Sequence, residues 1–116
     1  MSQYIIDAYE WVVAALEDGT DATVITDPRN ARPPCILVEP PSITANQNKT
    51  LAQLEFPITI LGIPPGNKDT VQFLLTVADD VIEAVGPTTG GPSVYTIGNQ
   101  DCPAYTLTAT IQIRRN

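Results

Sequence analysis

The stretch from Asp69 to Gly86 constrains the fold more than any other part of the chain. Its apolar residues recur at three- and four-residue steps: Val71, Leu74, Leu75, Ala78, Val81, Ile82 and Val85. This spacing predicts an amphipathic helix with one broad apolar stripe. Asp69 suits the N-cap because its carboxylate can accept a backbone N–H, and Gly86 followed by Pro87 suits the C-terminal end. A stripe this wide has to be covered, so we expect the flanking segments to form a sheet against it.

A second amphipathic helix is predicted over residues 3–18. Its apolar face consists of Ile5, Tyr9, Val12, Val13 and Leu16, with Ile6 nearby. Ser2 and Gly19 suit its two ends. Trp11 and Tyr4 lie off the centre of this stripe. Each is either an aromatic at the edge of the core or an anchor at a subunit contact, where aromatic side chains are enriched.

Strand character is found in the segments 22–26, 35–39, 51–63, 93–98 and 104–114. We take 51–63 as the longest strand, with Pro57 marking a sheet edge or a bulge because proline cannot donate a ladder hydrogen bond. The polar segment 42–50 is predicted to be a loop or hairpin tip, and 27–30 a turn. Residues 88–92 are expected to form a flexible connector, and 99–103 a loop.

These elements predict a single domain, 1–116, of the α+β class. Two helices pack on one face of a mainly antiparallel sheet, in the order α-β-β-β-α-β-β. Alternation in 104–114 places Thr106, Thr108 and Thr110 on the other face of the sheet. A face that is rich in threonine and poor in charge is suited to contact with other proteins.

The composition argues against several kinds of function. The chain has thirteen acidic and six basic residues, a formal charge of −7, and no histidine. An acidic chain does not bind nucleic acid through its overall field, although its surface suits a passage through which DNA slides. We expect Cys35 and Cys102 to be free thiols in a reducing cytoplasm, with a single disulfide as the open alternative. We also expect no secretory signal and no membrane span.

No group of residues predicts catalysis. Asp79, Asp80 and Glu83 share a helical surface and could be read as a metal site, but a hydrated helix surface explains them better. Asp101 and Cys102 could suggest a thiol nucleophile, but the usual histidine base is missing. We therefore predict a protein that is not an enzyme and that holds no cofactor or metal.

The local basic pairs are Arg29 with Arg32, and Arg114 with Arg115. Each pair is either a solvated turn or tail, or a group that binds an acidic patch on a neighbouring copy. The acidic excess of the chain gives weight to the second interpretation.

The order of elements resembles a known family. The N-terminal helix Tyr4–Leu16 is followed by short strands and a proline-bounded turn, then the strand Leu54–Leu61, the helix Val71–Val85 and a closing strand Tyr105–Ile113. This pattern is similar to that of the tail terminator proteins of long-tailed bacteriophages (siphoviruses), and more loosely to related neck proteins. The resemblance rests on the order, size and character of the elements along almost the whole chain.

The resemblance implies a structural virion protein that is assembled in the host cytoplasm. Such proteins form a ring, here expected to be a hexamer, that caps the tail tube, ends its polymerisation and provides the head-to-tail joining surface. The expected partners are other copies, the tail tube protein and a neck or head-completion protein, while DNA passes through the lumen without specific binding. The expected subunit-interface residues are Arg29, Arg32, Arg114 and Arg115, and the expected tube- or neck-facing loop is Asn46, Gln47, Asn48 and Lys49.

Two alternatives remain open. Within the same biology, the chain is a neck stopper, a head-completion protein or a minor tail protein. In a different class, it is a small acidic inhibitor or binding module that covers a basic enzyme surface.

Overall fold

The computed structural model describes residues 4–47, 50–64, 68–86 and 88–114. Two helices, α1 (Tyr4–Gly19) and α2 (Lys68–Val85), accompany a short 3-10 turn, η1 (Pro28–Asn30). The strands are β1 (Thr23–Ile25), β2 (Cys35–Val38), β3 (Ser42–Ala45), β4 (Leu51–Leu61), β5 (Thr88–Ile97) and β6 (Gln100–Arg114).

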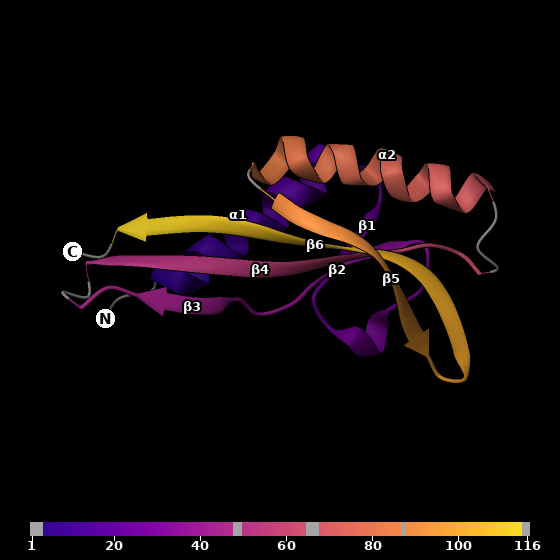
Figure 1. The fold of residues 1–116 in the computed structure, drawn as a ribbon, viewed down its shortest axis with the longest axis horizontal. Helices are drawn as coiled ribbons and strands as arrows, with labels where there is room; N and C mark the ends of the chain where they lie inside the picture. The colour runs from indigo at the N-terminus through magenta and orange to yellow at the C-terminus, as the bar shows by residue number, and fades with distance from the viewer. Residues whose placement is uncertain (1–3, 48–49, 65–67, 87, 115–116) are drawn as a thin grey trace.

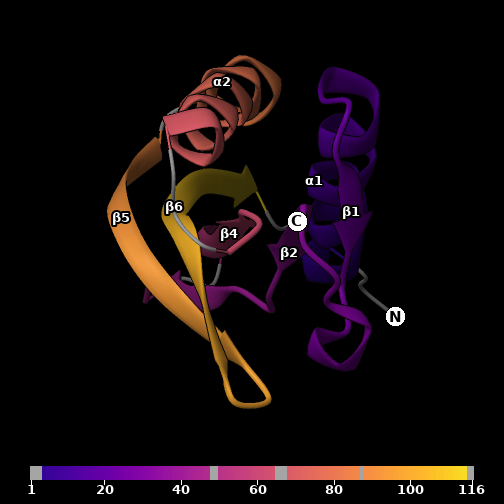
Figure 2. The same ribbon diagram turned by 90° about the vertical axis from the view of Figure 1, so that its right-hand side faces the viewer.

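The strands form one six-stranded sheet in the order β1-β2-β4-β6-β5, with β3 paired to β4 beside β2. β1 runs parallel to β2, and the other pairs are antiparallel. Both helices contribute to the core against the same sheet face, as Figures 1 and 2 show. The α+β prediction, with two helices and a mainly antiparallel sheet, is therefore confirmed.

The core lies between the helices and this sheet face. Val12 and Leu16 of α1 and Val81 of α2 are fully buried against Phe56 and Ile58 of β4. The ring of Tyr9 stacks on that of Phe56, with centroids 6.3 Å apart. A smaller cluster, built around Ala31, Cys35, Leu37 and Leu61, covers part of the opposite face beside η1.

The segment 42–50 was predicted as a loop or hairpin tip, and it contains a strand. β3 pairs with β4 from Ser42 opposite Glu55 to Ala45 opposite Ala52, so the element order gains one strand. All four residues of β3 are exposed. Its sequence therefore lacks the apolar pattern of a covered strand, and hydrogen bonds to β4 define it instead.

Two further loop predictions are wrong, at 88–92 and 99–103. β5 already begins at Thr88, and β6 begins at Gln100 after a two-residue turn in which Gly98 has φ +61°. Gly90 in this stretch allows close packing between β5 and β6. A Cβ on Gly90 would lie 2.1 Å from the backbone oxygen of Thr106. β6, with 15 residues, and not β4, with 11, is the longest strand.

Pro57 does not lie at a sheet edge, because β4 is a central strand between β2 or β3 and β6. The carbonyl oxygen of Pro57 accepts the N–H of Glu39 at 3.0 Å, where the neighbour of β4 changes from β2 to β3. In a strand, the N and O of one residue point to the same side. The missing N–H of Pro57 therefore faces this break between β2 and β3, where no donor is needed.

The ends of α2 agree with the sequence to within one residue. Gly86 has φ +83°, and its N–H donates to the carbonyl of Ile82 at 2.9 Å, which confirms the predicted C-terminal end. At the other end, the helix begins at Lys68, so Asp69 lies inside the first turn and is not the N-cap. The carboxylate still lies where the helix dipole favours a negative charge.

Candidate functional site

The described part of the chain presents several surfaces that suit contact with other molecules. The described residues contain no group of three or more Asp, Glu, Cys or His side chains that could hold a metal ion. Four surfaces stand out: an exposed apolar row on α2, the uncovered face of the sheet, the tip of the β3–β4 hairpin, and an acidic hollow beside β1.

The apolar row on α2, which we call the helix row, consists of Val71, Leu75 and Ile82. Their side chains are 49%, 49% and 47% exposed. The sequence predicted that these residues belong to the stripe that packs on the sheet, and this prediction is wrong. The buried side is formed by Thr70, Leu74, Val77, Ala78, Val81 and Val85. The sequence did contain a sign of this exposure, because the apolar stripe is wider than the surface that one sheet face covers.

A shallow groove runs beside the helix row. Its lining comes from Leu75, Ala78, Asp79 and Ile82 of α2, Thr88 and Gly90 of β5, and Tyr105 and Leu107 of β6. The space is about 440 Å³ and opens to solvent. Gly90 adds no side chain to it, so the groove stays open between the helix and the sheet. The exposed carboxylates of Asp79 and Glu83 lie along the solvent side of the same helix.

The sheet face away from the helices carries the polar residues of β4 and β6, and we call it the threonine face. It includes Thr106, Thr108, Thr110 and Gln112 of β6 and Gln53 and Glu55 of β4. Its charged side chains on these two strands are Glu55 and Arg114. The hydroxyl groups of Ser93 and Thr106 lie 2.8 Å apart, which ties β5 to β6 on this face. The predicted threonine-rich, weakly charged face is confirmed.

The hairpin end is the third surface, and it includes Ile43, Asn46, Leu51 and Arg114. Ile43 pairs with Leu54 and so lies on the helix side of the sheet, whereas Leu51 and Arg114 lie on the side of the threonine face. The side-chain oxygen of Asn46 accepts the N–H groups of Thr50 and Leu51 at 2.9 and 3.1 Å and closes the turn. Leu51 pairs with Arg114, so the structure brings Arg114 next to the loop that contains Asn46 and Gln47. The side chains of Ile43 and Leu51 are 53% and 46% exposed. Asn48, Lys49 and Arg115 lie outside the described residues.

Of the arginines named as interface residues, the described ones do not form one patch. Arg32 precedes Cys35, which pairs with Leu61, whereas Arg114 pairs with Leu51 at the other end of β4. Ten residues along a strand separate these ends by roughly 33 Å. Among the described members of this group, Arg114 is the one that lies beside the loop at Asn46.

Arg29 is occupied within η1. Its Nη2 lies 2.8 Å from Oδ2 of Asp27, and the backbone N–H of Arg29 donates to the same carboxylate at 3.0 Å. These hydrogen bonds lower the pKa of Asp27 below its usual value and raise the pKa of Arg29. The pair stabilises the predicted turn, and its guanidinium is committed to Asp27.

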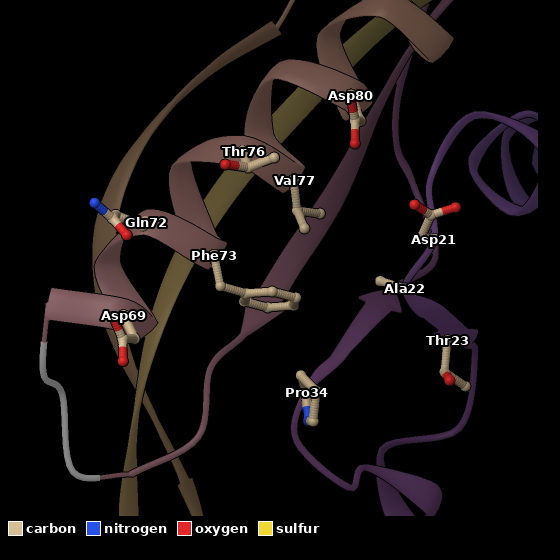
Figure 3. Close-up of a pocket in the computed structure, with 10 residues that line it drawn as sticks. All are labelled: Asp21, Ala22, Thr23, Pro34, Asp69, Gln72, Phe73, Thr76, Val77 and Asp80. Carbon is tan, nitrogen blue, oxygen red and sulfur yellow. The ribbon is translucent and has the colours of Figure 1, made fainter.

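The acidic hollow lies between α2 and the segment around β1. Figure 3 shows Asp69, Gln72, Phe73, Thr76, Val77 and Asp80 of α2 opposite Asp21, Ala22, Thr23 and Pro34. The space is about 440 Å³, with the ring of Phe73 inside it and the carboxylates of Asp21, Asp69 and Asp80 around it. Of the sequence-predicted acidic group, Asp80 lines this hollow, while Asp79 lines the groove on another side of the helix.

Cys35 and Cys102 are both free, as the sequence predicted, and the structure shows that both are buried. Burial raises the pKa of each thiol, and the neighbouring carboxylate of Asp101 adds to the rise at Cys102. A thiol with a raised pKa is a poor nucleophile at neutral pH.

None of the described helices is both long enough and apolar enough to span a membrane. Comparison of the sequence with models of known protein families finds no match. Comparison with the sequences of characterised proteins finds no significant match either.

Proposed function

We propose that this chain is the subunit of a ring that caps the tail tube of a long-tailed phage. The ring ends tube polymerisation and offers the surface to which the neck of the filled head binds. The proposal assigns the protein to the virion and gives it no catalytic role. It is supported by the resemblance in element order to tail terminator proteins and by the surfaces described above.

The observation that carries the proposal is the threonine face. β4 and β6 pair along the whole length of β4, which makes this face rigid. Threonine presents both a methyl group and a hydroxyl group, so the face suits dry as well as hydrogen-bonded contact with protein. Its low positive charge, in an acidic chain, means that DNA passing through a ring of such subunits is not held by phosphate contacts.

Removal of the protein from the phage tests the proposal. Without the cap, tubes should grow to variable and excessive length, and heads should stay unjoined, as seen by electron microscopy of lysates. Joined tails of uniform and normal length would refute the terminator function. Tails of normal length that fail only at joining would instead indicate the neck stopper or head-completion alternative.

Thr108→Glu tests the threonine face directly. The side chain of Thr108 is partly exposed in the middle of β6, so the variant should fold with an almost unchanged thermal midpoint. Its rings should fail to bind tube ends because an unpaired charge is then placed in the contact. Ala14→Glu, at an exposed position on α1, is the control and should retain binding. Normal tails from Thr108→Glu phage would show that this face is not the contact.

A second candidate function is favoured by the acidic hollow. Asp21, Asp69 and Asp80 around one concave surface suit a module that covers a basic protein surface. In that case the protein should remain monomeric and bind a basic peptide of arginines, and Asp80→Asn should weaken the binding. Assembly into rings with no affinity for the peptide would exclude this function.

A further inference from the structure

We propose that the helix row and its groove in one copy receive the hairpin end of a second copy. The contact joins subunits head to tail. This inference rests on the proposed ring function, because it names the surfaces through which the subunits of the ring bind one another.

The receiving surface is apolar with an acidic border. Val71, Leu75 and Ile82 are each about half exposed and span about 16 Å of helix. The groove beside them is open and reaches Tyr105 and Leu107 of the sheet. Asp79 lines the groove, and Glu83 lies one helical turn further along. A matching partner therefore needs exposed apolar side chains and a positive charge.

The hairpin end has these properties. Ile43 and Leu51 are about half exposed on opposite faces of the hairpin, and Arg114 lies directly beside Leu51 on the face that Leu51 occupies. The sequence from Ser42 to Gln53 contains no acidic residue. The chain as a whole has more than twice as many acidic as basic residues, so a segment of this length without an acidic residue is an exception in it. Its charge complements that of the groove, so the two surfaces attract each other.

The geometry favours a head-to-tail contact over a two-fold one. A two-fold contact through α2 would bring Asp79 and Glu83 close to the same residues of the partner, and like charges repel. The hairpin end instead lies at one end of the 48 Å long axis, away from most of α2 and β5 (Figure 1). Each copy can therefore use both surfaces at once, and repetition of one such contact closes a ring when the rotation allows it.

Matched variants test the contact by analytical ultracentrifugation over a series of protein concentrations. Leu75→Glu damages the groove, Ile43→Glu damages the hairpin end, and Trp11→Glu is the control. Trp11 is similarly exposed, at 52%, but lies on α1, on the other side of the molecule from β5 in Figure 2. Each of the first two variants should weaken self-association by about tenfold or more, because a charge has to be desolvated without a partner. Trp11→Glu should associate like the wild type.

Mixing provides the decisive result. Leu75→Glu retains an intact hairpin end, and Ile43→Glu retains an intact groove. At concentrations at which each variant alone is monomeric, an equal mixture should therefore form a dimer that grows no further. Failure of the mixture to form dimers, or loss of association by Trp11→Glu alone, overturns the proposal.

Charge exchange keeps the test independent of folding. Asp79→Arg and Arg114→Glu should each weaken association, and the chain that carries both changes should recover it. Lack of recovery overturns the pairing, as does a wild type that stays monomeric at every concentration. The tail-length experiment judges the ring function separately. A normal ring in every variant, together with overlong tails in the deletion phage, would reject these surfaces while the proposed function stands.

Discussion

The two apolar sides of α2 differ in what covers them, although their residues are alike. Leu74 is 5% exposed and packs in the core, whereas its neighbour Leu75 is 49% exposed. Val81 and Ile82 repeat the contrast about two turns later. The helix therefore has one side that holds the fold and another that the fold leaves uncovered. Stability and assembly should respond to different residues of the same helix.

The largest expected effect on stability distinguishes Leu74 from Leu75. Leu74→Ala should lower the free energy of unfolding by about 2–5 kcal/mol, because it removes buried methyl groups and leaves a cavity. Leu75→Ala should lower it by less than about 1 kcal/mol, because only part of the side chain is buried. Urea unfolding followed by circular dichroism measures both values.

The buried thiols supply a control for this comparison. Cys35 and Cys102 are inaccessible in the native state, and burial raises the pKa of each thiol. Alkylation at neutral pH should therefore be slow in the wild type and in Leu75→Ala, and faster in Leu74→Ala. Equal losses of stability in the two alanine variants would contradict the division of α2 into two sides.

The next effect separates two neighbouring glycines of β5. Gly90→Ala should lower the free energy of unfolding by about 1–3 kcal/mol, because its Cβ would meet the backbone oxygen of Thr106 at 2.1 Å and force β5 to shift. Gly91→Ala meets nothing within 4 Å and should cost much less. Thermal unfolding of the two variants side by side measures the difference, and a Gly90→Ala protein as stable as Gly91→Ala would rule out the close approach.

A smaller effect is expected on the threonine face. Ser93→Ala removes the hydroxyl that lies 2.8 Å from that of Thr106 and should cost about 0.5–1.5 kcal/mol. The alcohol pair is only partly buried, so this loss should be below that of Leu74→Ala. Chemical unfolding of Ser93→Ala measures it, with Thr89→Ala, at an exposed position on the same strand, for comparison.

The smallest effect concerns the exposed pair of Asp27 and Arg29. Hydrogen bonds from Arg29 lower the pKa of Asp27 below 3.8, so the pair contributes stability above this value. The contribution is lost as the pH falls through the lowered pKa and the carboxylate takes up a proton. The stability of Asp27→Asn should therefore differ slightly from that of the wild type at pH 7, and this difference in stability should vanish in strong acid. A difference that persists at low pH would show that something other than the ionised pair is responsible.

Local patterns were sufficient for much of the fold. The periodicity between Asp69 and Gly86 predicted α2, because helical spacing and a left-handed glycine are properties of the segment itself. The apolar residues of the segment 35–39 predicted a strand, and β2 (Cys35–Val38) is a strand in which all four residues are buried. Alternation in 104–114 predicted β6 and the threonine face. These features together indicated the α+β class.

Other features depended on residues that are distant in the sequence. β3 is a strand because β4 supplies its hydrogen bonds, and Gly90 belongs to β5 because β6 lies against it. Arg114 joins Asn46 only through the register between β4 and β6, which also separates Arg114 from Arg32. No local pattern encodes such pairings.

The helix from Lys68 to Val85 shows which features the sequence determines locally and which depend on the tertiary structure. The sequence alone determined that the segment is a helix and that apolar residues occupy a wide part of its surface. Only the tertiary structure decided that the sheet covers Leu74 and leaves Leu75 exposed. The reason is that burial depends on the width of the surface packed against the helix, and strands distant in the sequence set that width.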